Sequence, residues 1–234
     1  LAPGARLADV ACGPGTASIP AARRGLRVSA LDFSPRMLEQ LRARAAAEGV
    51  DGRIDVVEGD GQALPWADAS FEAAISIFGL MFFPDRARGF AELFRVLAPG
   101  GVALVASWRP AAESPLLGMM FGALQAADPA MPGPERNPFN LENVDVFERE
   151  LGAAGFVDLE VVPHTLEVDV PDAEAFWEKM TRSAAPLLLM RNRMGEEEWG
   201  RRAQLSRAWL QEQFAAGPRR LATTALFGSG RKPG

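Results

Sequence analysis

A glycine-rich segment and two aspartates are the residues whose types and spacing could do chemistry. Residues 9–16 read DVACGPGT and follow a short apolar run. This pattern predicts a buried strand and then a tight turn into a helix, in which glycines let a ligand approach the backbone closely. Asp32 ends the next apolar run, where a carboxylate can accept both hydroxyls of a ribose. Asp60 follows the third run and could accept an exocyclic adenine amine.

Each of these features also has a purely structural explanation. The glycine segment could be a plain turn between strand and helix, Asp32 could cap a helix that starts at Ser34 and Pro35, and Asp60 could be a turn aspartate. A dinucleotide-binding loop expects a third glycine where this chain has Ser18, which disfavours a pyrophosphate ligand. The three positions together, each after a strand, favour a ligand site.

The elements that must position these residues alternate along the first half of the chain. Apolar runs predict strands at residues 7–11, 27–31, 53–57, 71–78 and 102–108, and helical periodicity predicts helices at 16–24, from 34 onward and at 84–97. Such alternation predicts right-handed βαβ units and a mostly parallel sheet, which binds ligands at the carboxyl ends of its strands. Beyond residue 109 we expect helices at 113–127, 144–154, 172–193 and 196–214, an extended segment at 156–170 and a closing strand at 221–227.

Composition and charge exclude several classes of protein. The 234 residues include one cysteine and one histidine, which leaves no disulfide framework and no zinc cluster of ordinary spacing. No apolar run approaches the roughly 18 residues of a membrane span, and no signal-peptide pattern is present. Residues 1–109 carry no net charge, and residues 110–234 carry a net charge of −5. Because the chain has no cluster of basic residues in excess, we do not expect nucleic acid as a partner. We expect the protein to lie in the cytoplasm.

Four motifs resemble the class I S-adenosylmethionine-dependent methyltransferases. In order they are DVACGPG at residues 9–15, ALDFSPRML at 30–38, EGDGQALP at 58–65 with SFE at 70–72, and RVLAPGG at 95–101. FGLMFFPD at 78–85 is typical of the small-molecule branch, which includes quinone-biosynthesis enzymes and methyltransferase types 11 and 25. The resemblance implies an α/β Rossmann-like, doubly wound seven-stranded sheet, mostly parallel with an antiparallel last strand, plus a helical lid insertion.

The resemblance also implies roles for individual residues. Asp9 and the backbone of residues 11–15 would hold the amino-acid part of S-adenosylmethionine, Asp32 would take its ribose, and residues 60–62 would surround its adenine. The implied cofactor-binding residues are Asp9, Ala11, Cys12, Gly13, Gly15, Asp32, Phe33, Met37, Asp60, Gly61, Gln62, Ile77 and Phe78. Two positions depart from the family pattern. Ala11 replaces the commoner first glycine and adds a methyl near the cofactor, and Glu72 replaces the usual aspartate at a position we expect to be structural.

Methyl transfer from a sulfonium is an in-line displacement for which a protein mainly supplies positioning and a dry site. A general base is needed only when the acceptor must lose a proton. His164 is a weak candidate for that role and is expected to be structural or exposed, and no tyrosine is available. We therefore assign no catalytic residue and no metal site. The competing functions are a nicotinamide-dependent oxidoreductase on the same fold, and a protein of methyltransferase fold that transfers no methyl group.

The predicted organisation is a single domain. It comprises a cofactor-binding core at residues 1–109, a helical lid with the sixth strand at 110–220, and the closing strand at 221–234, with the family's N-terminal helix apparently missing. The acceptor side of the lid is rich in apolar side chains: Trp108, Met119, Met120, Phe121, Phe139, Phe176, Trp177, Met180, Leu187, Leu188, Leu189 and Met190. These favour a small, flat, apolar acceptor, although stripes at helical spacing are more often core. The oligomeric state stays open, a homodimer included.

Overall fold

The chain divides into two compact units. The computed structural model describes residues 1–131, 141–183 and 185–234. The sheet unit comprises Leu1–Trp108, Pro138–His164 and Ala225–Gly234, and the helical unit comprises Arg109–Asn137 and Thr165–Thr224. The predicted lid, residues 110–220, is therefore split, because helix α5 (Val144–Ala153) and the first half of strand β6 (Val157–Val170) belong to the sheet unit.

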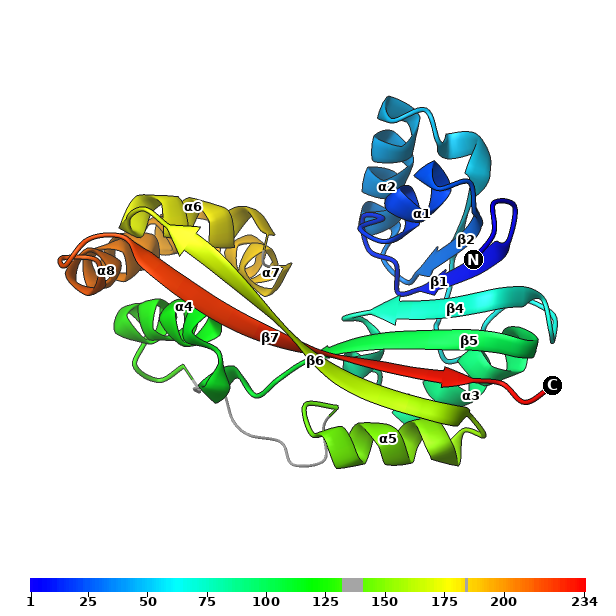
Figure 1. Cartoon of the computed structure of the whole chain (residues 1–234). Helices are drawn as coiled ribbons and strands as arrows, with labels where there is room; N and C mark the ends of the chain where they lie inside the picture. The colour runs from blue at the N-terminus through cyan, green and yellow to red at the C-terminus, as the bar shows by residue number, and fades with distance from the viewer. Residues whose placement is uncertain (132–140, 184) are drawn as a thin grey trace. The chain divides into compact units, whose positions relative to one another are not determined.

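The described strands form a seven-stranded sheet in the order β3-β2-β1-β4-β5-β7-β6 (Figure 1). Strands β1 (Arg6–Val10), β2 (Arg27–Asp32), β3 (Ile54–Glu58), β4 (Phe71–Ile77) and β5 (Leu97–Trp108) pair in parallel, and β7 (Arg219–Arg231) pairs with β5 in antiparallel orientation. The predicted fold class is confirmed. Because β2 and β4 flank β1, the loops after these three strands lie beside one another at one edge of the sheet.

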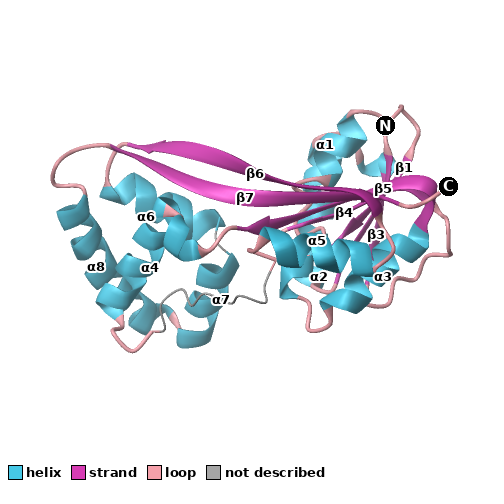
Figure 2. Cartoon of the chain, turned by 60° about the horizontal axis from the view of Figure 1, so that its bottom comes forward, coloured by secondary structure: helices cyan, strands magenta, loops and turns pink. Residues whose placement is uncertain are grey.

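Two apolar cores of the sheet unit cover the two faces of its sheet. Side chains on one face pack against helices α1 (Ser18–Arg23) and α2 (Pro35–Ala47), with Leu7, Val28 and Leu41 among the buried residues. The alternate positions pack against α3 (Arg86–Val96) and α5, which lie side by side (Figure 2). Coverage on both faces explains the nearly continuous apolar runs of β1 and β4.

Strand β5 begins five residues earlier than predicted. Leu97 already pairs with Phe71, and the register then shifts before Val102 pairs with Ala73. The helix predicted at 84–97 ends at Val96, and the PGG sequence at residues 99–101 lies within the irregular start of the strand. The glycines matter here because Gly100 has a φ of +77°.

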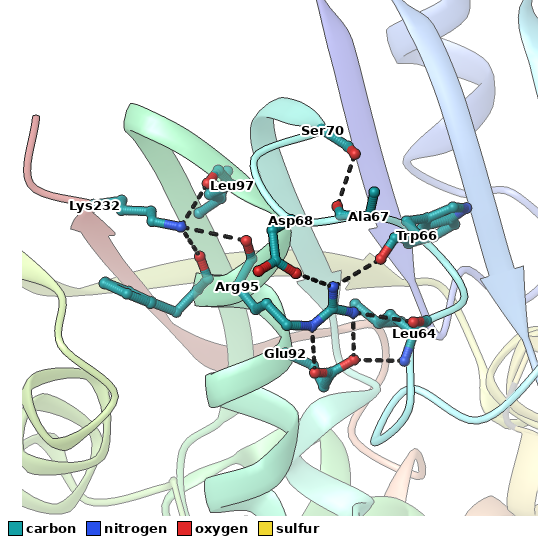
Figure 3. A network of polar contacts seen from close by, with 10 residues as sticks. Leu64, Trp66, Ala67, Asp68, Ser70, Glu92, Arg95, Leu97 and Lys232 are labelled. Carbon is teal, nitrogen blue, oxygen red and sulfur yellow. Dashed lines mark hydrogen bonds and ion pairs between the residues drawn. The ribbon is translucent and has the colours of Figure 1, made fainter.

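A polar network fixes the loop that follows β3 (Figure 3). Arg95 at the end of α3 donates to the carbonyls of Leu64 and Trp66 at 3.0 and 2.8 Å, and also pairs with Glu92. Glu92 in turn accepts from the Leu64 backbone N–H at 2.7 Å. The Lys232 ammonium donates to the carbonyls of Phe94 and Arg95 in the last turn of α3, which lack a partner within the helix, and to the carbonyl of Leu97 at the start of β5. The loop that carries residues 60–62 is therefore anchored to α3.

The helical unit is built from α4 (Pro115–Ala127), α6 (Ala173–Ser183), α7 (Ala185–Met194) and α8 (Glu196–Gln213). The helix predicted at 172–193 is thus two helices, on either side of residue 184, which lies outside the described residues. Five of the predicted lid side chains are buried in this unit's core: Met119, Phe176, Trp177, Met180 and Leu187. Phe139 and the side chains of Leu188 and Leu189 lie outside the described residues. Among the helices that are described, none is long and apolar enough to span a membrane.

Candidate functional site

The glycine-rich segment forms the turn from β1 into α1. Gly13 and Gly15 have φ of +54° and +83°, a left-handed region that favours glycine. A side chain at Gly15 would collide with Leu41, whereas the space next to the Gly13 α-carbon is open. The loop therefore presents an uncovered stretch of backbone at Gly13 and is packed against α2 at Gly15.

Asp9, at the base of this loop, is almost fully buried. Ser18 donates its hydroxyl to Asp9 Oδ2 at 2.5 Å, and both side chains are buried. Burial, helped by the nearby charge of Asp32, raises the pKa of Asp9 to about 6 against the opposing effect of the Ser18 hydrogen bond. Ser18, which the sequence pattern marks only as a missing third glycine, is thus the partner that orients Asp9.

Asp32 is 5% exposed and holds two backbone segments together. Its Oδ2 accepts from the N–H of Gly13 at 2.8 Å, and its Oδ1 accepts from the N–H of Ser34 at 2.9 Å. The bond to Ser34 corresponds to the capping explanation, and the bond to Gly13 ties Asp32 to the glycine-rich loop. Each carboxylate oxygen retains acceptor capacity, because a carboxylate can accept about four hydrogen bonds. Asp32 can therefore accept two further hydroxyl groups.

Asp60 differs from Asp32 because it is exposed and its partner is local. The backbone N–H of Gln62 donates to Asp60 Oδ1 at 2.8 Å, and the Gln62 amide donates to the same carboxylate. These hydrogen bonds from Gln62 hold the pKa of Asp60 below its usual value. Gln62 Oε1 accepts from the Asp85 N–H at 2.8 Å, and the Gln62 carbonyl accepts from Arg88. The Gln62 side chain thus joins its loop to the start of α3.

Two aromatic side chains stack at the ends of β4 and β5. Phe78 follows β4, and its ring lies on that of Trp108 with a centroid separation of 4.0 Å and an interplanar angle of 8°. Both residues and the adjacent Ile77 are partly buried. Trp108, which the sequence pattern assigned to the lid, belongs to the sheet unit, because it is the last residue of β5 and pairs with Ala225.

The remaining predicted residues are more dispersed. Phe33 is 78% exposed directly after Asp32, and Met37 is partly buried on the first turn of α2. Cys12 is buried, and this burial raises the pKa of its thiol well above the usual range, so the thiol stays protonated. Gly61 is covered by Phe83, whose ring a side chain at position 61 would meet at 2.4 Å. Phe83 therefore packs against the loop of residues 60–62.

His164 is not brought near these groups. It lies exposed on β6, the edge strand, with three strands between it and β1, and its ring contacts Phe227. Glu72 accepts from the backbone N–H and side chain of Arg6 at the start of β1, which holds the pKa of Glu72 below its usual value. Within the described ranges, no group of three or more histidine, cysteine, aspartate or glutamate side chains could hold a metal ion.

Comparison with known proteins agrees with this geometry. Residues 7–101 match the family described as methyltransferase domain. An uncharacterized protein of Mycobacterium tuberculosis is 44% identical over 108 residues, which cover 46% of this chain and 39% of that protein. A demethylmenaquinone methyltransferase of Renibacterium salmoninarum is 40% identical over 129 residues, which cover 55% of this chain and 52% of that enzyme. The matched region thus spans about two fifths to one half of these relatives.

A solved structure has the same fold over the whole chain. The [4+2]-cyclase SpnF superposes with a TM-score of 0.63 at 22% identity, covering 100% of this chain and 78% of SpnF. At that level of identity the likeness concerns the fold alone. The strand order, the glycine-rich loop and Asp32 therefore carry the functional argument for this chain.

Proposed function

Because residues 7–101 belong to the methyltransferase domain family, we propose that this chain is an S-adenosylmethionine-dependent methyltransferase that acts on a small, largely apolar organic molecule. The observation that carries the proposal is Asp32. Its carboxylate is 5% exposed, fixed by two backbone N–H groups, and joined directly to the glycine-rich loop. The carboxylate is thus held in a fixed orientation in which it could accept hydrogen bonds from two ribose hydroxyls, next to the open space beside Gly13.

The residues at this edge of the sheet fit the parts of the cofactor. The space beside the Gly13 α-carbon is open to the amino-acid part, while the Gly13 N–H stays bonded to Asp32, whose carboxylate can accept hydroxyl donors. Asp60 offers an exposed carboxylate that accepts from an amine such as that of adenine. The open space at Gly13 is the structural observation behind this fit, because a nearby side chain there would exclude a ligand from the backbone.

When bound, S-adenosylmethionine supplies a methyl group on a sulfonium. The chain's own residues position that group and limit the access of water. The stacked rings of Phe78 and Trp108 form an apolar surface at the ends of β4 and β5, next to the loop after β1. An apolar surface is compatible with the reaction because charge disappears as the methyl leaves the sulfonium. Among the described residues near this edge we assign no general base, so the proposed acceptor is one that needs no protein base.

The helical unit supports an apolar acceptor by its composition. Its buried side chains include methionine, tryptophan, phenylalanine and leucine, and its ion pairs are exposed or partly exposed. A phosphate-rich polymer is not the proposed acceptor, because residues 110–234 carry a net negative charge.

Calorimetric titration with S-adenosylhomocysteine and, separately, with NAD tests the cofactor assignment. We expect S-adenosylhomocysteine to bind and NAD to bind weakly or not at all, because Ser18 stands where a dinucleotide-binding loop has its third glycine. Tight binding of NAD alone would instead support a nicotinamide-dependent oxidoreductase. Binding of S-adenosylhomocysteine without methyl transfer from labelled S-adenosylmethionine to any small apolar acceptor would favour a protein that keeps the fold without this reaction.

A further inference from the structure

Phe78 has a backbone conformation that a large side chain adopts only under constraint. Its φ is +61°, in the left-handed region, where a bulky residue is a genuine outlier. Such conformations persist when the surroundings determine them, and they concentrate at functional sites. Phe78 is also the residue that turns the chain out of β4 at the carboxyl edge of the sheet.

Three contacts hold this turn in place. The Phe78 N–H donates to the carbonyl of Ala106 in β5 at 3.2 Å, and the Phe78 ring stacks on Trp108. The N–H of Leu80 donates to the hydroxyl of Ser76 at 3.0 Å, and both of these side chains are fully buried. The backbone on both sides of Phe78 is therefore tied to the sheet, and its ring is tied to Trp108.

Gly79 joins this turn to the glycine-rich loop. A Cβ at position 79 would lie 2.4 Å from the Cβ of Ala11, 3.2 Å from the Ser76 hydroxyl and 3.3 Å from the Ala11 carbonyl. Ala11 itself has a φ of +57°, although it carries a side chain. The methyl of Ala11, which the family resemblance implies to lie near the cofactor, is thus directed against the turn at Gly79.

We propose that Gly79 is a positioning residue for methyl transfer. Because it has no side chain, the Ala11 methyl can pack against the turn, and this contact couples the glycine-rich loop to the orientation of the Phe78 ring on Trp108. Ala11 and Gly79 then form a steric pair in which only one of the two can carry a Cβ. The inference rests on the proposed function, because it assumes that the loop holds the cofactor and that the ring faces the acceptor.

A double-mutant cycle tests the pair. Gly79→Ala, Ala11→Gly and the double variant are compared with the original chain for S-adenosylhomocysteine affinity, near-ultraviolet circular dichroism and urea unfolding. We expect Gly79→Ala to lose at least about tenfold in affinity, which is 1.4 kcal/mol, and to change the tryptophan band. The double variant should recover most of the affinity and of the band, because removal of the Ala11 methyl removes the 2.4 Å contact and leaves only the milder contacts at 3.2 and 3.3 Å. Trp108→Phe identifies the contribution of Trp108 to that band.

Gly52→Ala is the matched control. A Cβ at Gly52 meets no atom within 4 Å, and its backbone is outside the left-handed region, so this variant should behave like the original chain. The proposal is wrong if Gly79→Ala matches the original chain in affinity and spectrum. It is also wrong if the double variant is as impaired as Gly79→Ala, or if the cycle shows coupling in unfolding alone, since the pair would then be merely structural.

Two further outcomes separate the inference from the function on which it rests. If the original chain does not bind S-adenosylhomocysteine, the proposed function fails. The steric pair is then tested by the tryptophan band and by urea unfolding. Both measurements must show coupling between the substitutions at positions 11 and 79. If Gly79→Ala does not fold, Ala11→Gly provides the test, because removal of the methyl should weaken the tryptophan band. An unchanged band in Ala11→Gly would overturn the inference.

Discussion

The sheet unit and the helical unit use buried polar groups in different ways. Among the described residues, the buried carboxylates are Asp9 and Asp32, and both lie at the carboxyl edge of the sheet unit. The buried polar side chains of the helical unit are hydroxyls, and they serve its own packing. Ser206 donates to the carbonyl of Ala123, and Ser114 donates to Thr223.

This difference supports our proposal that the chemistry lies in the sheet unit. A buried carboxylate is costly unless its hydrogen bonds are satisfied, so a fold that retains two at one edge has a use for them there. Buried hydroxyls that bond to a carbonyl or to another hydroxyl within the same unit need no such explanation. The comparison suggests that cofactor affinity depends on the sheet unit alone, and the following substitutions test this separation, beginning with the largest expected effect.

Leu210→Ala and Leu41→Ala form a matched pair, because each leucine is fully buried on a helix, one in each unit. Both should lower the free energy of unfolding by about 2–5 kcal/mol. The folded Leu210→Ala protein should keep its S-adenosylhomocysteine affinity within about twofold, a change near 0.4 kcal/mol. Leu41→Ala should weaken binding, because Leu41 supports the loop at Gly15. Calorimetric titration below the unfolding transition measures both affinities. Equal losses in the two variants would contradict the claim that cofactor affinity depends on the sheet unit alone.

Asp9→Asn should change how stability depends on pH. Because burial raises the pKa of Asp9 from 3.8 to about 6, the native state binds this proton more tightly than the unfolded chain does. Ionisation therefore lowers the free energy of unfolding as the pH rises from 3.8 to 6, by roughly 3 kcal/mol in all. Urea unfolding measures the free energy of unfolding of Asp9→Asn and of the original chain. The difference between the two values should grow over this pH range and level off above it. Parallel pH curves would show that Asp9 does not titrate as its burial requires.

Asp32→Ala should weaken S-adenosylhomocysteine binding by about 1.5–3 kcal/mol, the scale of a lost hydrogen bond to a charged group. The loss combines the ribose contacts with the support that Asp32 gives to Gly13. Asp55→Ala, which removes an exposed carboxylate from β3, is the control and should bind normally. An unchanged dissociation constant in a folded Asp32→Ala protein would make the ribose assignment wrong.

Asp60→Ala should have the smallest effect. Asp60 is exposed and its hydrogen bonds are to Gln62, so its proposed contact with adenine would compete with solvent. We expect affinity to fall by less than about fivefold, as for other exposed charged contacts. Calorimetric titration of Asp60→Ala and Asp32→Ala with S-adenosylhomocysteine compares the two losses of affinity directly. A loss that matches or exceeds that of Asp32→Ala would reverse the ranking of the two carboxylates.

Local patterns were sufficient to predict the parallel strands and the edge at which their carboxyl ends meet. The apolar runs and turn residues of β1 to β4 identify strands, and the carboxyl ends of parallel strands necessarily share one edge. Helix α2 was predictable from Ser34 and Pro35, because proline suits the first helical position. These features depend on residues that are close together in the sequence.

What could not be predicted depends on contacts between distant residues. The stack of Phe78 on Trp108, the contact of Gly79 with Ala11 and the bond from Gly13 to Asp32 join residues 19 to 68 positions apart. The sequence analysis considered Ser18 only as the residue that stands in place of a third glycine. Its hydroxyl, nine residues after Asp9 and at the start of a helix, could have indicated the hydrogen bond to Asp9. The early start of β5 likewise has no clear local signal. The division of the helix predicted at 172–193 did have one, because Pro186 disfavours a helix interior and suits the first turn of α7.

A structure of the chain with S-adenosylhomocysteine bound tests the central claim most directly. Our account predicts that both ribose hydroxyls lie within hydrogen-bond distance of the Asp32 carboxylate, which keeps its bonds to Gly13 and Ser34. It also predicts that the amino-acid part lies along residues 11–15 and that the sulfur faces the Phe78 ring. A bound molecule whose hydroxyls contact other groups, with Asp32 holding only its two backbone partners, would contradict the account.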